Sequence, residues 1–196
     1  MTLQPLKSVC VYCGSRTGAN PVYAREATEL GKGLAERGLD LVYGAGSIGL
    51  MGLVARASVD AGGSVIGIIP DHLDAVEITQ GGLAEIHVTG SMHERKKMMF
   101  DRSDAFLVLP GGLGTLDELF EIVTWAQLGL HRKPIVLVNS GGYWDALVTL
   151  VRSIVTEGFA KPAHADLITV TASAAEALAH LDSVAMVEGE GLSELI

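Results

Sequence analysis

The segment 104–125, DAFLVLPGGLGTLDELFEIVTW, constrains the fold more than any other part of the chain. Its apolar run is typical of a buried strand and stops at Pro110. A glycine-rich loop then leads into a segment with helical spacing of apolar residues. This order predicts an anion site, because the first N–H groups of a helix lack internal partners and the helix dipole favours negative charge there. No Gly-Lys-Ser/Thr follows the glycines, so the loop is not of the Walker A type. We predict that a phosphorylated ligand docks here.

The rest of the chain alternates apolar runs with amphipathic segments. Candidate strands lie at residues 6–13, 39–43, 64–69, 85–88, 105–109, 134–138 and 167–170. Candidate helices lie at 22–37, 50–61, 91–102, from 115 onwards, 143–157 and 174–181. This alternation predicts an α/β fold: a single doubly wound, mostly parallel, Rossmann-like sheet with helices on both faces. We assign residues 1–181 to this domain and 182–196 to an acidic, loosely held C-terminal tail.

A doubly wound sheet also predicts where the ligand binds. Ligands of such sheets lie beyond the carboxyl ends of the strands. The loops that follow three of the predicted strands should therefore share one crevice. The residues of these loops that we expect to line the crevice are Ser15, Gly46, Gly111, Gly112, Leu113, Gly114 and Thr115.

Composition narrows the classes of function. Hydrophobic residues make up 48% of the chain and charged residues 19%, which indicates a compact globular domain. With 14 basic and 23 acidic residues, the net charge of −9 disfavours binding to a nucleic acid polymer, although a single nucleotide needs only a few local cations. The first residues do not resemble a secretory signal, and the apolar runs are far shorter than a membrane helix. We expect a cytoplasmic protein without a membrane partner.

The two cysteines, Cys10 and Cys13, have the spacing of a CxxC redox pair. A reactive pair normally lies at a helix N-terminus, whereas these residues belong to a predicted strand, in which positions three apart point to opposite faces. No second Cys or His pair nearby would complete a zinc site. We therefore expect two buried thiols that pack as small apolar groups, and no metal.

The sequence GAGSIG after the second predicted strand satisfies the GxGxxG pattern of dinucleotide-binding proteins. It does not open the first strand–helix–strand unit, as that pattern usually does. Asp71, after the next strand, lies near the place where an acid would bind a ribose. NAD binding thus stays a minor alternative.

Basic residues cluster at the predicted helix 91–102. Lys97 extends the Arg95-Lys96 pair, and a run of this kind usually forms a solvated helix face. An acidic protein that binds phosphate nevertheless needs cations, and the guanidinium of an arginine suits phosphate or ribose oxygens. The neighbouring methionines are typical of core packing.

Glu118 has two competing interpretations. Thr115 and Glu118 have the spacing of a capping box, in which the two side chains satisfy free N–H groups at the start of a helix. A catalytic carboxylate at the same position would lie close to the sugar of a nucleotide whose phosphate occupies the glycine loop. Sequence spacing does not decide between these roles.

Two segments, SMHERKKMMF and LPGGLGTLDELFEIVTWAQLGLHRKP, closely resemble the "Lonely guy" (LOG) family of cytokinin riboside 5′-monophosphate phosphoribohydrolases. The family motifs MHxRK and PGGxGTxxE are matched by Met92, His93, Arg95, Lys96, Pro110, Gly111, Gly112, Gly114, Thr115 and Glu118. VCVYCGS, LVYGAGSIGLMG, GGSVIGIIP and VEIT are also similar, so the likeness covers about Ser8 to Phe159. Ala45 stands where the family usually has a third glycine; the difference is one methyl group, and we expect it to put little of the resemblance in doubt.

The resemblance implies hydrolysis of the N-glycosidic bond of an adenosine-type 5′-monophosphate, without a cofactor, in a Rossmann-like homodimer whose pocket lies near the subunit interface. It implies that Arg95 and Glu118 are the catalytic pair. It places in the substrate site Glu77, Met92, Lys96, the loop 112–118 and Thr124. The physiological nucleotide and the residues that would hold a prenyl group stay open.

Rival functions belong to other classes. A non-catalytic nucleotide-binding or sensing module would use the same glycine loop. A single-strand DNA-binding relative with a similar fold is disfavoured by the negative charge. Members of the family have also been labelled lysine decarboxylases, which would require a lysine that binds pyridoxal phosphate, and no such lysine stands out.

Overall fold

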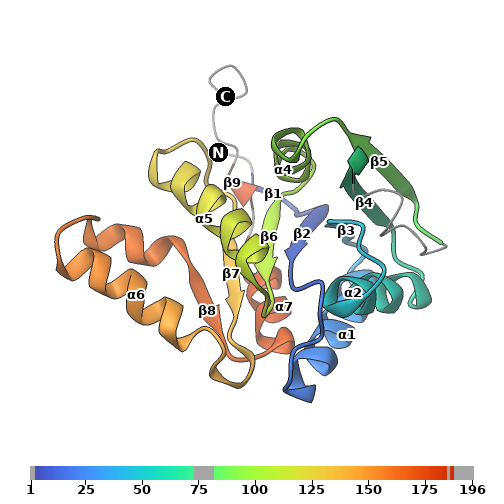
Figure 1. The fold of residues 1–196 in the computed structure, drawn as a ribbon, viewed down its shortest axis with the longest axis horizontal. Helices are drawn as coiled ribbons and strands as arrows, with labels where there is room; N and C mark the ends of the chain where they lie inside the picture. Colours follow the sequence, from blue (N-terminus) through green and yellow to red (C-terminus); the bar gives the residue numbers. More distant parts are fainter. Residues whose placement is uncertain (1–2, 73–81, 185, 188–196) are drawn as a thin grey trace.

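The computed structural model describes residues 3–72, 82–184 and 186–187, and Figure 1 shows a central sheet between two layers of helices. The main sheet contains seven strands in the order β5-β4-β3-β2-β6-β7-β8. Every neighbouring pair in it is parallel, as predicted from the alternation of strands and helices. The strands are β2 (Ser8–Tyr12), β3 (Asp40–Tyr43), β4 (Val65–Pro70), β5 (Glu85–Thr89), β6 (Ala105–Val108), β7 (Ile135–Val138) and β8 (Thr169–Thr171).

Helices cover both faces of this sheet. The helices are α1 (Pro21–Glu36), α2 (Gly49–Asp60), α4 (Met92–Asp101), α5 (Leu113–Gln127), α6 (Asp145–Thr156) and α7 (Ala174–Ser183). One hydrophobic core contains residues of α1, α2 and α7, and the other contains residues of α4, α5 and α6. Two 3-10 helices, η1 (Ser140–Gly142) and η2 (Pro162–Leu167), were not predicted from the sequence. No helix in the described part of the chain has the length and apolar character needed to cross a membrane.

The side chains of strand β2 alternate between the two hydrophobic cores. Val9 and Val11 pack in the core beneath α1 and α2, whereas Cys10 and Tyr12 pack in the core beneath α4 and α5. Cys13 belongs to the first core, so the two cysteines lie on opposite faces, as predicted. Both are free and buried, and burial raises the pKa of each thiol well above its usual value. The prediction of packed thiols is confirmed, and the CxxC redox interpretation is wrong.

Side-chain caps mark the start of α1, α4 and α7, and those of α4 and α7 share one pattern. Ser91 accepts a hydrogen bond from the Glu94 N–H (3.2 Å), and the Glu94 carboxylate accepts one from the Gly90 N–H (2.7 Å). This pair resembles a capping box at the start of α4, except that the Glu94 carboxylate bonds the residue before the N-cap. Ser173 and Glu176 make the equivalent pair at α7. The cap of α4 fixes the helix that carries the predicted cationic residues.

The two ends of the described chain lie together. Strands β1 (Leu3–Gln4) and β9 (Met186–Val187) form a separate antiparallel pair. Helix α7 runs to Ser183, beyond the expected start of the tail, and Asp182 accepts hydrogen bonds from Arg37 at 2.9 Å. Helix α7 therefore extends past the predicted boundary, and its last turn is paired with Arg37 at the end of α1.

The sheet order places a crevice at the ends of β2 and β6. The chain runs outward from β2 through β3 and β4 to β5, and then crosses back to β6 on the other side of β2. At such a switch point the connections leave in opposite directions, which opens a crevice at the carboxyl ends of the two strands.

Candidate functional site

Backbone contacts join the three loops that were predicted to share a crevice. The Gly14 N–H donates a hydrogen bond to the Pro110 carbonyl (3.1 Å), and the Gly14 carbonyl accepts one from the Leu50 N–H (3.0 Å). A Cβ on Gly49 would lie 2.2 Å from the carbonyl carbon of Ser15, so only glycine permits this approach. The loops after β2, β3 and β6 therefore meet at the switch point, as predicted.

The N-terminus of α5 is open to solvent at this place. Its N-cap residue, Gly112, has extended backbone (φ −97°, ψ −155°) and provides no side-chain cap. Among the described residues, none would lie within 4 Å of a Cβ on Gly112 or Gly114, and the Leu113 side chain is 85% exposed. The free N–H groups of the first turn can thus be approached from outside, which is the geometry of an anion site.

The capping-box interpretation of Thr115 and Glu118 is wrong. Helix α5 already begins at Leu113, so Thr115 lies inside its first turn and is not the N-cap. Thr115 instead packs against the glycine loop, where a Cβ on Gly111 would come within 2.1 Å of its hydroxyl oxygen. Glu118 is one turn further along and points into the protein. Its carboxylate is therefore available for another role.

Arg95 is the partner of Glu118. The Arg95 Nη1 donates to the Glu118 Oε1 at 3.0 Å, and the exposed fraction of each side chain is 10%. The Arg95 Nε donates to the Ile68 carbonyl (3.1 Å), and Nη2 lies 3.5 Å from the Gly44 carbonyl. A Cβ on Gly44 would be 1.9 Å from Nη2, so this glycine makes room for the guanidinium. Three acceptors, from β4, from α5 and from the loop after β3, hold Arg95 in one orientation.

The ionisation of Glu118 is shifted toward neutral pH. Burial raises the pKa of the Glu118 carboxyl to about 7, while the guanidinium of Arg95 opposes this shift. Burial has the larger effect because the carboxylate loses most of its hydration and has a single close cationic partner. A carboxyl group with this pKa can accept or donate a proton near neutral pH.

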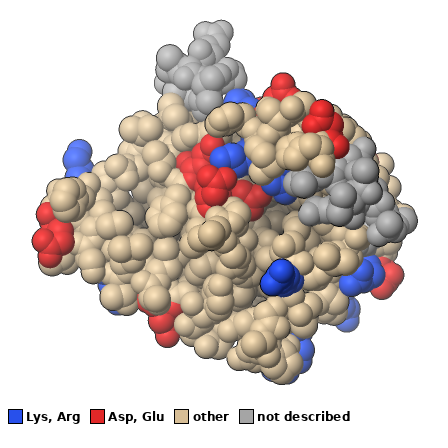
Figure 2. Space-filling model, viewed as in Figure 1, with Lys and Arg blue, Asp and Glu red and all other residues tan. Residues whose placement is uncertain are grey.

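Lys96 and Lys97 lie on different faces of α4. Lys96 is buried against α5, where its Nζ contacts the Asp117 carboxylate (3.0 Å) and the Glu121 carboxylate (3.2 Å), and these contacts raise its pKa. Among the residues that the structure describes, Lys97 pairs only with Asp101, at the surface of the same helix. The solvated-face interpretation therefore holds for Lys97 and fails for Lys96. Figure 2 shows the resulting gathering of charged side chains where α4 meets α5.

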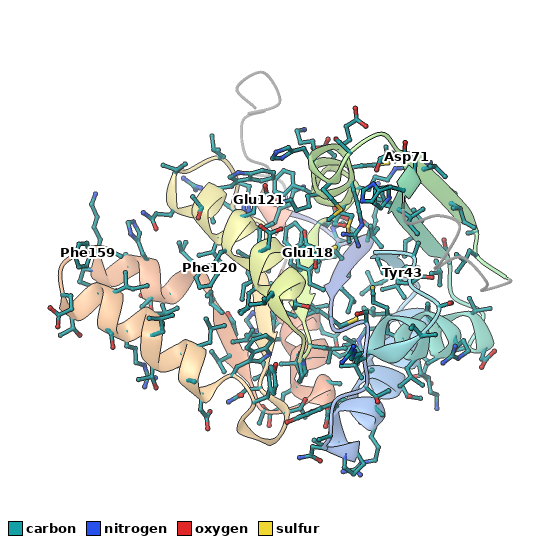
Figure 3. The ribbon with its side chains drawn as sticks, in the orientation of Figure 1. Tyr43, Asp71, Glu118, Phe120, Glu121 and Phe159 are labelled. Carbon is teal, nitrogen blue, oxygen red and sulfur yellow. The ribbon has the colours of Figure 1, made fainter. Side chains whose placement is uncertain are left out.

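The remaining predicted residues lie around this centre. Ser15 is exposed beside the glycine loop, Gly46 is buried against Met51, and Met92 is exposed at the first turn of α4. Asp71 is exposed at the end of β4 and accepts a hydrogen bond from the His72 N–H (Figure 3). Glu77 lies outside the described residues.

Thr124 lies apart from the glycine loop. It is exposed about 14 Å further along α5 than Thr115, given the helical rise per residue. There it lines a shallow hollow of about 340 Å³ on the outer face of the helix. The other residues of this hollow are Leu116, Asp117, Phe120, Glu121 and Trp125. Figure 3 shows Phe120 and Glu121 on α5.

The structure also adds residues that the sequence did not single out. Gly44 supplies an acceptor to Arg95, and Asp117 and Glu121 hold Lys96. Only the position of Gly44 directly after a strand could have pointed to it. The acidic side chains of α5 are four residues apart, as on many solvated helices, so nothing in the sequence marks them as partners of a buried lysine.

Ala45, the departure from the family pattern, lies in left-handed backbone. Ala45 has φ +61° and is the one non-glycine residue with positive φ in the described ranges. A left-handed backbone costs an alanine about 1 kcal/mol relative to glycine. A glycine at this position would avoid that cost, which explains the residue that the family usually has.

Comparisons with known proteins show which family the chain resembles. The profile of a family described as "Possible lysine decarboxylase" matches residues 51–181. The cytokinin riboside 5′-monophosphate phosphoribohydrolase LOG7 of Arabidopsis thaliana is 46% identical over 181 residues, which cover 92% of this chain and 83% of that protein. The probable cytokinin riboside 5′-monophosphate phosphoribohydrolase LOGL9 of Oryza sativa subsp. japonica is 51% identical over 174 residues, which cover 89% of this chain and 76% of that protein.

A solved structure supports the fold. The molybdenum cofactor carrier protein of Chlamydomonas reinhardtii matches with a TM-score of 0.70 at 23% identity, over 92% of this chain and 97% of that one. At this identity the likeness concerns the fold alone. The relatives from A. thaliana and O. sativa are far more similar in sequence, and they match over most of the chain. The chain therefore belongs to the LOG family of cytokinin riboside 5′-monophosphate phosphoribohydrolases.

Proposed function

We propose that this protein hydrolyses the N-glycosidic bond of cytokinin riboside 5′-monophosphates and of AMP, giving a free base and ribose 5-phosphate. The observation that carries the proposal is the buried Arg95–Glu118 pair, which lies one helical turn beyond the open N-terminus of α5. The relatives that match most of the chain carry the name of this activity.

The two parts of the site suit the two parts of a nucleotide. The free N–H groups at Gly112, Leu113 and Gly114 would bind the 5′-phosphate. Glu118 follows Leu113 by five residues, which corresponds to about 8 Å along the helix axis. A ribose attached to the bound phosphate would bring its anomeric carbon toward the Glu118 carboxylate.

The charge of the pair fits the chemistry of glycosidic cleavage. As the bond to the base breaks, positive charge develops on the ribose. The carboxylate of Glu118 would stabilise this charge and orient the attacking water. Arg95 uses three of its five N–H donors on Glu118, Ile68 and Gly44. Its remaining donors would hold the nucleotide and assist the departure of the base.

Incubation with AMP and with isopentenyladenosine monophosphate tests this proposal, with chromatographic detection of free base. We expect both bases to be released, and turnover to fall at least about 100-fold in Glu118→Gln, because the amide keeps the shape and loses the charge. Asp101→Asn is the matched control, since it makes the same change at an exposed carboxylate on α4. Undiminished turnover in Glu118→Gln would refute the role of Glu118.

Two other outcomes would refute the hydrolase itself. Binding of AMP without release of adenine would indicate a nucleotide-binding or sensing module built on the same open helix N-terminus. Decarboxylation of lysine in the presence of pyridoxal phosphate would instead support the description attached to the family profile.

We further propose that the protein acts in the cytoplasm as a homodimer. The hollow on the outer face of α5 has apolar walls at Leu116, Phe120 and Trp125, and the exposed fraction of Phe120 is 36%. Most of the surface over α5 and α6 carries no charged side chain in Figure 2. A second copy of the chain on this face would cover these apolar groups.

A further inference from the structure

A tyrosine from outside the family motifs reaches the glycine loop. The hydroxyl of Tyr143 donates a hydrogen bond of 2.6 Å to the carbonyl oxygen of Gly111. The two residues are 32 positions apart, and Tyr143 belongs to the connection between β7 and α6. Within the described residues this is the one side-chain hydrogen bond to the backbone of residues 111–114.

The connection that carries Tyr143 is held rigidly. Asn139, at the end of β7, accepts a hydrogen bond from the Trp144 N–H (2.6 Å) and donates one to the Asp145 carboxylate (2.7 Å). Gly141 and Gly142 have φ values of +61° and +75°, so the turn before Tyr143 uses backbone that favours glycine. The segment that follows β7 therefore holds the phenol against the glycine loop.

Aromatic contacts orient the phenol ring. The rings of Tyr143 and Tyr23 pack edge to face with their centroids 5.5 Å apart. The ring of Trp144 also packs edge to face with that of Tyr143, with centroids 4.7 Å apart. Such pairs stabilise one ring orientation by about 1 kcal/mol. The side chain of Tyr143 is still 41% exposed, which places it at the border between the loop and solvent.

The bonded carbonyl lies between two peptide groups that backbone hydrogen bonds hold: the Gly14 N–H donates to the Pro110 carbonyl and the Leu116 N–H to the Gly112 carbonyl. The peptide between Gly111 and Gly112 is planar, so its C=O and its N–H turn together. A glycine on each side allows this plane many orientations. The Gly112 N–H has no acceptor within the described part of the chain. Together with these neighbouring hydrogen bonds, the donor on the Gly111 carbonyl helps to fix where this free N–H points.

We propose that Tyr143 is a positioning residue for the phosphate end of the substrate. By fixing the Gly111 carbonyl, its hydroxyl aims the Gly112 N–H at the anion that occupies the N-terminus of α5. A hydrogen bond to the carbonyl also polarises the peptide and makes its N–H a stronger donor. This inference rests on the proposed function in one respect, the assignment of the 5′-phosphate to the glycine loop.

Tyr143→Phe tests the inference, because it removes the hydroxyl and keeps the ring contacts. Tyr23→Phe is the matched control: it removes a phenol hydroxyl from the same aromatic pair, and within the described residues that hydroxyl has no hydrogen bond to the glycine loop. Calorimetric titration with inorganic phosphate, ribose 5-phosphate and AMP measures binding without turnover. The melting temperature of each variant shows that it is folded.

We expect the Kd values of all three ligands to rise about three- to tenfold in Tyr143→Phe, the effect of one neutral hydrogen bond, and to stay unchanged in Tyr23→Phe. The KM for AMP should rise by the same factor, with kcat changed less than twofold. Adenosine, which lacks the phosphate, should show equal kcat/KM in both variants and the parent. Equal phosphate affinity in Tyr143→Phe and the parent would overturn the inference, as would an equal loss with adenosine and with AMP.

Failure of the proposed function would look different. If no base is released but the phosphate Kd values separate the two variants as expected, the hydrolase proposal falls and the positioning role of Tyr143 stands. If base is released and Tyr143→Phe binds phosphate as the parent does, the hydrolase proposal stands and the positioning role of Tyr143 falls.

Discussion

At the scale of single residues, the site depends on a carboxyl group whose burial opposes its ionisation. Burial raises the pKa of Glu118 to about 7, and the single guanidinium of Arg95 does not cancel this effect. Folding therefore favours the protonated form of Glu118. The stability that this preference contributes is fully present below the ordinary pKa of a glutamate, and it is lost as the pH rises through about 7.

The free energy of unfolding should reveal this shift. Between pH 5 and pH 8 we expect the wild-type protein to lose about 2 kcal/mol relative to Glu118→Gln, because the amide does not titrate. Urea denaturation of both proteins at several pH values measures the difference. Parallel pH dependences would show that Glu118 has an ordinary pKa in the folded protein.

At the scale of elements, ion pairs join α4 to α5, and the acidic partners of these pairs differ in how far they are buried. Their facing sides carry the Arg95–Glu118 pair and the contacts of Lys96 with Asp117 and Glu121. Ser91 and Glu94 cap α4 and so fix the rotation of the helix that turns Arg95 and Lys96 inward. The same rotation leaves Lys97 at the surface with Asp101.

Adjacent lysines on α4 offer a matched comparison. We expect Lys96→Ala to lower the free energy of unfolding by about 1–2 kcal/mol, because it leaves Asp117 and Glu121 close together without their shared cation. Lys97→Ala should change it by less than about 0.5 kcal/mol, since it removes one exposed pair within a helix. Chemical denaturation measures both changes. Equal effects would mean that the buried lysine does not connect the two helices.

At the scale of the whole molecule, the order of the strands places the site and leaves one face apolar. The switch between β2 and β6 opens the crevice in which the loops meet. Helix α5 begins in that crevice and also carries the hollow around Phe120 on its outer face. One helix thus connects the candidate site with the face proposed for a second copy.

Sedimentation velocity tests this assembly. We expect a mass near twice the 20.5 kDa of one chain, and a shift to one chain for Phe120→Asp, because a carboxylate in the covered hollow would lose its hydration. Ile86→Asp is the control: Ile86 is 43% exposed on β5, the edge strand on the side of the sheet away from α6 (Figure 1), so this variant should keep the mass of the parent. A wild-type mass of 20.5 kDa would refute the homodimer.

Much of this architecture was predictable from the sequence, because its signals are local. Apolar runs separated by helical periodicity determined the parallel sheet and the approximate bounds of its helices. The glycines after the strand ending at Pro110 indicated an anion site, because an uncapped helix N-terminus next to a strand needs no distant partner to form. The assignment of Arg95 and Glu118 to catalysis came from family resemblance, and their roles stay proposals.

Only the tertiary structure decided the features that depend on distant partners. The spacing of Thr115 and Glu118 allowed a capping box, but the helix begins earlier and Glu118 turns to Arg95, 23 residues away. Packing between elements raises the pKa of Glu118 and buries Lys96 while Lys97 stays at the surface. Local periodicity determines which segments form strands and helices, whereas hydration lost between packed elements determines which charges meet and how they ionise.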